Sequence, residues 1–218
     1  MTGSTYVFDA YGTLFDVHAA AGKHKAAVGA DWERFSERWR AKHLEYTWVL
    51  SMIGRHTSFR KLLEQSLDTA AASIGGITAE TRGALLEAYD ALDAFPEVKA
   101  VLAELKKRRA RLAILSNGDA DMLQRVVASA GLGDHLNAVF TVAEVGVFKP
   151  SARVYRYATT KLGVDKAQIT FVSANRWDVA GAQAFGFKTI WLNRAGAPDE
   201  YPDLPPARVI GDLGELLG

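Results

Sequence analysis

The segment TYVFDAYGTLFDV, residues 5–17, decides the fold class of the chain. Its first four residues are apolar or β-prone, and they run directly into Asp9 and the turn residues around Gly12. A short apolar run that ends at turn residues is typical of a buried strand. We therefore expect a buried strand over residues 5–8 that carries a carboxylate at its end.

The second half of the chain alternates between apolar runs and helical patterns. After the first strand, the strand candidates are residues 111–115, 138–141, 169–172, 189–192 and 209–210. Strands that are separated by helices of about ten or more residues form right-handed crossovers in a parallel sheet with both faces covered. The pattern therefore predicts an α/β protein with a Rossmann-like three-layer core.

A long insertion separates the first strand from the rest of this core. Residues 16–92 are charged and alanine-rich, with apolar side chains three to five positions apart at Trp32, Phe35, Trp39, Leu44 and Trp48. Such spacing is typical of helices. We expect a core domain formed by residues 1–15 and 93–218, and a helical cap domain formed by residues 16–92.

Composition excludes several classes of partner. The 218 residues are 49% hydrophobic and 23% charged, and 26 basic against 25 acidic residues leave a net charge of +1. This balance favours a small-molecule partner over nucleic acid or a membrane. Because the chain has no cysteine, it forms no disulfide and has no thiolate nucleophile. No secretory signal or membrane span is visible, so we expect a cytoplasmic protein.

Polar residues follow the predicted strands where a ligand would bind. In open α/β sheets, ligands bind beyond the carboxyl ends of the strands. The residues at these ends are Asp9, Ser116, Asn117, Lys149, Ser173, Asn175 and Asp178. Taken singly, Asp9 could be a turn or helix-capping residue and Lys149 a surface cation. Their common position makes this edge of the sheet the candidate site.

Four segments together resemble a known family. FDAYGTLFDV (8–17), LSNG (115–118), VFKPSARVY (147–155) and SANRWD (173–178) are similar, in this order, to the four signature motifs of the haloacid dehalogenase superfamily. The resemblance covers nearly the whole chain, including the cap-like insertion. It implies a Rossmann-like core with an inserted cap and a nucleophilic aspartate, which here is Asp9.

Departures from the pattern of the superfamily's phosphotransferases point to another reaction. Those enzymes carry a second aspartate two residues after the nucleophile, where this chain has Tyr11, which is no obvious general acid. They also bind magnesium, usually through carboxylates, and the fourth motif here offers only Asp178. A halide leaves without a proton, so we expect dehalogenation without metal or other cofactor.

The insertion supplies a cation for the leaving halide. Arg40 in WRAKHLEYTW (39–48) resembles the arginine of the L-2-haloacid dehalogenase subgroup; without that match it would be interpreted as an exposed helix cation. The resemblance implies that Asp9 displaces halide from a small (S)-2-halo carboxylic acid and forms an aspartyl ester. Water then attacks the ester carbonyl with help from Asp178, and an (R)-2-hydroxyacid leaves.

The resemblance also assigns the remaining site residues. The predicted catalytic residues are Asp9, Thr13, Arg40, Ser116, Lys149, Tyr155, Ser173, Asn175 and Asp178. The predicted substrate-binding residues are Tyr11, Leu14, Arg40, Leu44, Phe59, Ser116, Asn117 and Trp177. For the apolar residues Tyr11, Leu44, Phe59 and Trp177, the alternative to substrate binding is packing in the core or between the domains. The five histidines lack the spacing of a metal-binding helix face, and we expect no metal site.

Two other functions stay open at this point. One is a magnesium-dependent phosphatase of the same superfamily, and the other is a non-catalytic binding module, since a fold alone does not guarantee activity. The resembled subgroup commonly forms homodimers, and the aromatic-rich cap helices could supply the contact patch. We therefore expect a homodimer.

Overall fold

The computed structural model describes residues 4–218 and is built around one parallel sheet. Its six strands lie in the order β3-β2-β1-β4-β5-β6, and every neighbouring pair is parallel. The strands are β1 (Thr5–Phe8), β2 (Arg111–Ser116), β3 (Ala138–Thr141), β4 (Ile169–Ser173), β5 (Lys188–Leu192) and β6 (Arg208–Ile210). Every predicted strand lies within an observed one, so the α/β prediction is confirmed.

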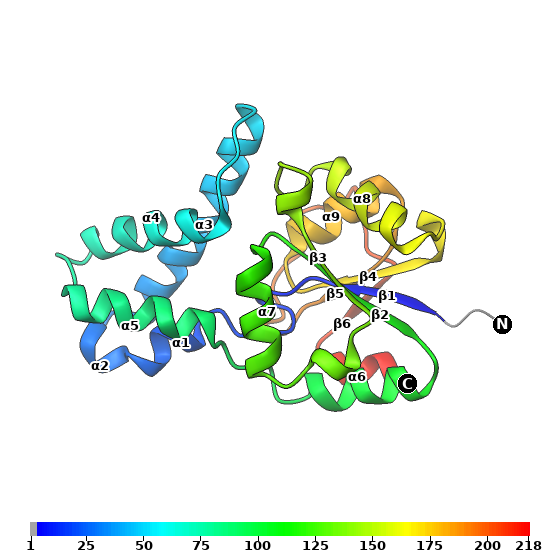
Figure 1. The fold of residues 1–218 in the computed structure, drawn as a ribbon, viewed down its shortest axis with the longest axis horizontal. Helices are drawn as coiled ribbons and strands as arrows, with labels where there is room; N and C mark the ends of the chain where they lie inside the picture. The colour runs from blue at the N-terminus through cyan, green and yellow to red at the C-terminus, as the bar shows by residue number, and fades with distance from the viewer. Residues whose placement is uncertain (1–3) are drawn as a thin grey trace.

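Helices on both faces of the sheet complete three layers. They are α6 (Val98–Lys107), α7 (Ala120–Ser129), α8 (Ala152–Leu162) and α9 (Arg176–Phe185), with 3-10 segments η1 (Gly133–His135), η2 (Val142–Glu144), η3 (Lys166–Gln168) and η4 (Leu213–Leu217). Helices α8 and α9 cover one face, and α6 with the C-terminal η4 covers the other (Figure 1). This arrangement confirms the Rossmann-like core.

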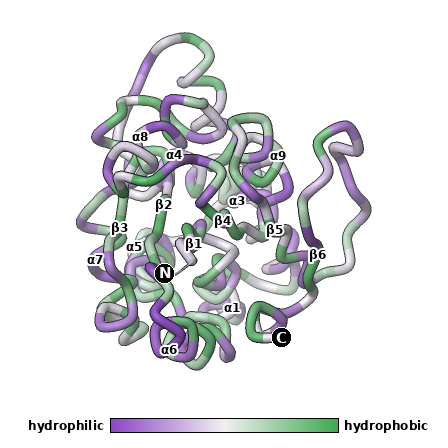
Figure 2. Tube along the Cα trace, turned by 90° about the vertical axis from the view of Figure 1, so that its right-hand side faces the viewer, coloured by the Kyte–Doolittle hydropathy of each residue, from purple (hydrophilic) through white to green (hydrophobic). Residues whose placement is uncertain are grey.

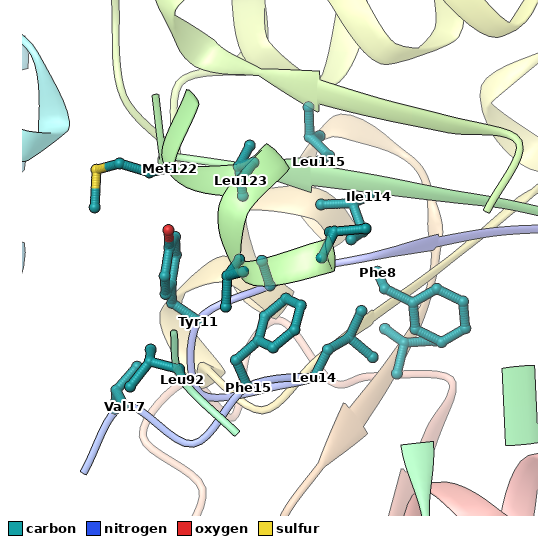
Figure 3. Packing of buried hydrophobic residues seen from close by; sticks show 14 of the residues in the cluster. Phe8, Tyr11, Leu14, Phe15, Val17, Leu92, Ile114, Leu115, Met122 and Leu123 are labelled. Atoms are coloured by element: carbon teal, nitrogen blue, oxygen red, sulfur yellow. The ribbon is translucent and has the colours of Figure 1, made fainter. Parts of the chain in front are cut away.

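Strand β1 lies in the middle of the sheet, and this position determines where its end points. It pairs with β2 on one side and β4 on the other, and Val7 and Phe8 are fully buried. Apolar side chains from neighbouring elements, among them Ile114 and Leu115, pack around it (Figure 3). Along the chain, α6 alternates between polar and apolar residues, as expected for a helix with one face on a core (Figure 2).

The segment between β1 and α6 is helical, as predicted. It contains α1 (Ala19–Lys23), α2 (Lys25–Val28), α3 (Trp32–Met52), α4 (Phe59–Ala72) and α5 (Ala79–Asp90), which form a separate lobe beside the sheet (Figure 1). We call these five helices the helical insertion. Ser58 and Thr78 cap the N-termini of α4 and α5 through their side-chain oxygens.

The helical insertion leaves and re-enters the core at one place. The Asp16 N–H donates to the Asp93 carbonyl at 2.9 Å, and the Phe95 N–H donates to the Leu14 carbonyl at 3.0 Å. The two connecting segments therefore run side by side, next to the loop that carries Asp9. Among the described residues, no helix combines the length and the apolar character needed to cross a membrane.

Candidate active site

Asp9 lies at the carboxyl end of the central strand and is only 5% exposed. Its Oδ2 accepts hydrogen bonds from Thr13 Oγ1 at 2.9 Å and from Asn175 Nδ2 at 2.7 Å, and Ser173 Oγ lies at 3.5 Å. Its Oδ1 accepts one hydrogen bond, from Lys149 Nζ at 3.0 Å. The structure thus brings Asp9 together with four of the predicted residues, one from its own segment and three from two other segments.

A tight turn after β1 orients this carboxylate. The N–H groups of Thr13 and Leu14 both donate to the Ala10 carbonyl, and Gly12 adopts a φ of +91°, which side chains other than glycine rarely allow. The turn brings the Thr13 hydroxyl back onto Asp9. The same hydroxyl oxygen accepts the N–H of Ala174, so it also ties the loop after β4 to the site.

Lys149 is a buried cation between two carboxylates. Its side chain is 1% exposed, and Nζ donates to Asp9 Oδ1 at 3.0 Å and to Asp178 Oδ2 at 2.8 Å. Burial alone would lower the pKa of Lys149, but the charges of Asp178 and Asp9 more than offset it and leave that pKa raised. The ammonium group therefore stays charged and neutralises part of the buried negative charge.

Asp178 in the first turn of α9 is fully buried. Burial raises its pKa to about 6; Lys149 opposes this shift, and the nearby charge of Asp9 adds to it. Tyr155 Oη donates to Asp178 Oδ1 at 2.7 Å, and burial, with Asp178 second, raises the pKa of Tyr155 well above its usual value. The Tyr155 hydroxyl therefore keeps its hydrogen at neutral pH and donates it to Asp178.

Arg40 reaches the site from α3 in the helical insertion. Its Nη2 donates to the Tyr11 carbonyl at 3.1 Å and lies 3.5 Å from Asn175 Oδ1. Because Asn175 itself donates to Asp9, the guanidinium lies one side chain away from the carboxylate. The helical insertion therefore places its predicted cation against the Asp9 loop and not in bulk solvent.

The predicted apolar wall is found in two parts. Tyr11 and Phe59 are buried with ring centroids 5.5 Å apart, and buried Leu44 lies one helical turn after Arg40 on α3. Trp177 is half-buried and packs edge-on against Trp48, with centroids 5.4 Å apart. Both tryptophans line an open cavity of about 570 Å³ between α3 and the loop that carries Lys149.

Three other predicted residues, Asn117, Ser116 and Leu14, form hydrogen bonds with backbone groups and not with Asp9 within residues 4–218. Asn117 Oδ1 accepts the Lys149 N–H at 3.0 Å, so this amide positions the cation. Ser116 is fully buried, and its hydroxyl oxygen accepts the Gly118 N–H at 3.1 Å; within residues 4–218 it makes no bond to Asp9. The Leu14 N–H already donates to Ala10 and its side chain is core, so we drop Leu14 from the proposed substrate donors.

Two glycines that the sequence did not single out permit the close packing of this site. A Cβ at Gly181 on α9 would lie 2.5 Å from Pro150 Cβ and 2.7 Å from Tyr155 Oη. A Cβ at Gly118 would lie 2.7 Å from the Tyr11 ring. Real Cβ atoms do not approach so closely, so these positions need glycine. Gly118 falls inside the LSNG segment, whereas Gly181 looks like an ordinary helix residue.

Asp119 joins the core to the helical insertion and was also missed. Its carboxylate accepts the N–H of Phe59 at 3.0 Å and of Arg60 at 2.8 Å, the first two residues of α4. A carboxylate at a helix N-terminus satisfies free N–H groups and interacts favourably with the helix dipole. In the sequence, Asp119 directly follows the LSNG segment, just beyond the end of a predicted strand, and this position could have indicated a site residue.

Comparison with known proteins gives the family. A family model described as haloacid dehalogenase-like hydrolase matches residues 4–186. The chain is 39% identical over 211 residues to (S)-2-haloacid dehalogenase 1 of Pseudomonas sp. (strain CBS-3), covering 96% of this chain and 93% of that protein. It is 44% identical over 190 residues to the (S)-2-haloacid dehalogenase of Pseudomonas sp. (strain YL), covering 87% and 82%.

Solved structures agree with the sequence comparison. The L-2-haloacid dehalogenase from Xanthobacter autotrophicus with chloropropionic acid covalently bound superimposes with a TM-score of 0.87 at 34% identity, covering 98% of this chain and 96% of that one. The chain is a hydrolase whose core is a parallel sheet between helices, with an aspartate at the end of the central strand. It belongs to the haloacid dehalogenase-like hydrolase family.

Acidic residues do not gather into a metal centre in the part of the chain that the structure describes. Residues 4–218 contain no group of three or more His, Cys, Asp and Glu side chains arranged to hold an ion. The two carboxylates that do approach each other, Asp9 and Asp178, share the Lys149 ammonium.

Proposed function

We propose that the chain is an (S)-2-haloacid dehalogenase that hydrolyses (S)-2-haloacids to (R)-2-hydroxyacids and halide through an Asp9 ester and without a metal ion. The observation that carries this proposal is the buried Asp9 carboxylate. Its Oδ1 accepts a hydrogen bond from Lys149, and the guanidinium of Arg40 is hydrogen-bonded to the Tyr11 carbonyl of the same loop. The (S)-2-haloacid dehalogenases similar over most of the chain support it, as does the Xanthobacter enzyme with covalently bound chloropropionic acid.

The hydrogen bonds of Asp9 indicate which oxygen attacks. Oδ2 accepts hydrogen bonds from Thr13 and Asn175, with Ser173 near, whereas within residues 4–218 Lys149 is the only donor to Oδ1. Oδ1 therefore keeps a lone pair for the bond to C2 of the substrate. As this bond forms, the C2–halogen bond breaks, and the halide leaves on the opposite side with the electron pair, toward Arg40. One displacement inverts C2, and no proton is needed.

Water then cleaves the ester at the Asp9 carbonyl carbon. Its oxygen adds to this carbon and gives up a proton to Asp178, whose pKa of about 6 suits a base at neutral pH. Donors to Asp9, among them Lys149 and Asn175, stabilise the negative charge that develops. The bond between the carbonyl carbon and Oδ1 breaks, the hydroxyacid takes a proton on Oδ1, and the Asp9 carboxylate carries an oxygen from water.

The other residues have supporting parts in this proposal. Thr13, Ser173 and Asn175 hold Asp9, while Tyr155 orients Asp178 and Asn117 holds the Lys149 backbone. The Ser116 hydroxyl, with its own hydrogen still to donate, would bind the substrate carboxylate. Tyr11, Leu44, Phe59 and Trp177 would surround the alkyl group, and Asn117 Nδ2 would face the halide.

We also propose that residues 16–92 act as a cap over a core formed by residues 1–15 and 93–218. The adjacent connections at residues 14–16 and 93–95 support this division. A homodimer in the cytoplasm completes the proposal. The exposed apolar side chains of Val49, Met52 and Ile53 at the end of α3 offer a contact patch. Sedimentation equilibrium tests this state, and a monomer at all concentrations would contradict it.

A paired assay separates dehalogenation from phosphatase activity. We expect halide release from (S)-2-chloropropionate in excess EDTA, and no phosphate release from p-nitrophenyl phosphate with magnesium. Tyr11 occupies the position of a phosphatase's general acid, and burial raises the pKa of its phenol well above the usual value. Phosphate release that a chelator abolishes would contradict the proposal, and absence of both activities would indicate a binding module.

A further inference from the structure

We propose that Tyr89 is a second halide-binding residue, whose hydroxyl donates a hydrogen bond to the departing halide beside Arg40. The inference rests on the proposed dehalogenation and assigns one more residue to that site. Tyr89 lies in the last turn of α5, the helix that leads from the helical insertion back toward the core. It was not among the residues that the sequence singled out.

The first argument is that two polar groups here are buried and unpaired. Tyr89 is 3% exposed, and its Oη has no hydrogen-bond partner among the described residues. Neither, within residues 4–218, has Nη1 of Arg40. Native proteins leave few buried polar atoms unpaired, because each costs free energy. These two donors, together with the Tyr11 hydroxyl, which is likewise unpaired among the described residues, indicate a ligand with lone pairs beside the nucleophile's loop.

The second argument is the position of the Tyr89 ring. It stacks on the Tyr11 ring with centroids 5.5 Å apart and planes at 25°, and its centroid is also 5.5 Å from that of Trp39. Tyr11 is two residues after Asp9, and Trp39 precedes Arg40. The phenol is thus fixed between the nucleophile's loop and the helix that carries the guanidinium.

The third argument is a small cavity at the same place. Its volume is about 10 Å³, room for one water-sized particle, and Trp39, Arg40, His43 and Tyr89 are among its lining residues. His43 donates from Nε2 to the Phe59 carbonyl at 3.2 Å, and burial lowers its pKa to about 3, so it is neutral. Of the described residues that line the cavity, Arg40 alone carries a charge. A monatomic anion fits this combination of size and charge.

The protonation state of Tyr89 suits a donor. Burial raises the pKa of its phenol to about 12; the nearby charge of Arg40 acts in the opposite direction, and that of Asp9 adds to the rise. The hydroxyl therefore keeps its hydrogen at neutral pH.

The expected effect depends on the halide. Chloride concentrates its charge in a smaller volume than iodide and gains more from each hydrogen bond. Loss of one hydrogen bond to a charged group corresponds to at least about a tenfold loss in binding. We therefore expect Tyr89 to matter most for chlorinated substrates and for inhibition by chloride.

The test variant is Tyr89→Phe, which keeps the stacked ring and removes only the hydroxyl. Its matched control is Tyr157→Phe on α8, where the hydroxyl is likewise buried without a hydrogen-bond partner in the described chain. We expect Tyr89→Phe to raise the inhibition constant of chloride about tenfold. We also expect it to slow (S)-2-chloropropionate turnover far more than (S)-2-iodopropionate turnover, while Tyr157→Phe behaves as the native protein.

The possible outcomes keep the two proposals apart. Native protein that releases halide from neither substrate would overturn the dehalogenase function itself. An active native protein with an unchanged chloride inhibition constant and chloro-to-iodo ratio in Tyr89→Phe would overturn only the role of Tyr89. If Tyr89→Phe fails to fold, anomalous scattering from bromide-soaked native crystals decides. Bromide within hydrogen-bond distance of Tyr89 Oη supports the inference, and bromide bound only elsewhere refutes it.

Discussion

Replacing Lys149 with methionine tests how strongly the site depends on a buried cation between the carboxylates of Asp9 and Asp178. In the native protein the Nζ atom lies 3.0 Å from Asp9 Oδ1 and 2.8 Å from Asp178 Oδ2, and all three side chains are buried. Lys149→Met preserves most of the side chain's length but leaves two carboxylates facing each other without a cation. We expect both halide release and stability to fall.

The size of the stability loss follows from burial. Removing one partner of a buried ion pair costs about 3–5 kcal/mol, because the remaining charge stays out of water. For a chain of this size, the loss corresponds to a decrease in Tm of about 6–20 °C. Asp178→Asn is the matched control. It leaves the Lys149–Asp9 pair balanced and keeps an acceptor for Tyr155, so we expect the smaller loss of about 1 kcal/mol typical of an ordinary substitution.

The pH dependence of the loss has a definite sign. In Lys149→Met, the opposing cation is gone, so burial and the charge of Asp9 raise the folded pKa of Asp178 further above the unfolded value of about 3.9. The folded variant then binds a proton more readily than the unfolded chain. Its deficit relative to the native protein is therefore complete above the folded pKa and shrinks as the pH falls toward the unfolded pKa.

Urea unfolding of both variants and the native protein, at about pH 8 and about pH 5, measures this deficit. We expect a large deficit for Lys149→Met at the higher pH and a smaller one at the lower pH. A Lys149→Met protein as stable as the native one at the higher pH, or a deficit that grows on acidification, would refute the reasoning.

Three further variants or conditions test other parts of the site. Because burial raises the pKa of Asp178 to about 6, ester hydrolysis should slow as the pH falls through this value; quenched-flow would show the ester accumulating, and a constant rate would exclude Asp178 as the base. Asp119→Ala should lower stability by about 2 kcal/mol, since it removes a partly exposed carboxylate that accepts two hydrogen bonds from N–H groups of α4; calorimetry should show a Tm about 4–8 °C lower, and an unchanged Tm would argue against this link. Gly181→Ala should reduce kcat by displacing Tyr155, whereas Gly83→Ala on α5, where a Cβ meets nothing within 4 Å, should leave kcat unchanged; equal kcat in both would contradict the close packing.

The sheet could be predicted from the sequence because its inner strands are buried on both faces. Such strands are short continuous apolar runs, and residues 111–115 and 169–172 show this pattern clearly. The polar residues at the strand ends followed from the parallel topology alone. For that reason the meeting of Asp9, Lys149 and Asp178 could be expected before any coordinates were known.

Features that depend on how the helical insertion sits on the core could not be predicted. Asp119 binds the start of α4, about sixty positions away in sequence, and no local pattern fixes that pairing. Tyr89 looked like an ordinary core aromatic, because an unpaired hydroxyl is visible only once its surroundings are known. Gly181 resembled any small residue in a helix until the approach of Pro150 was seen.

A single turnover in water labelled with heavy oxygen tests the Asp9 ester most directly. With the protein in excess over (S)-2-chloropropionate, the hydroxyl oxygen of the product should come from Asp9 Oδ1. Mass spectrometry should then find the label in the peptide that contains Asp9 and none in the hydroxyacid. Label in the product hydroxyl, with the Asp9 peptide unlabelled, would mean that water attacks C2 itself and that Asp9 is not the nucleophile.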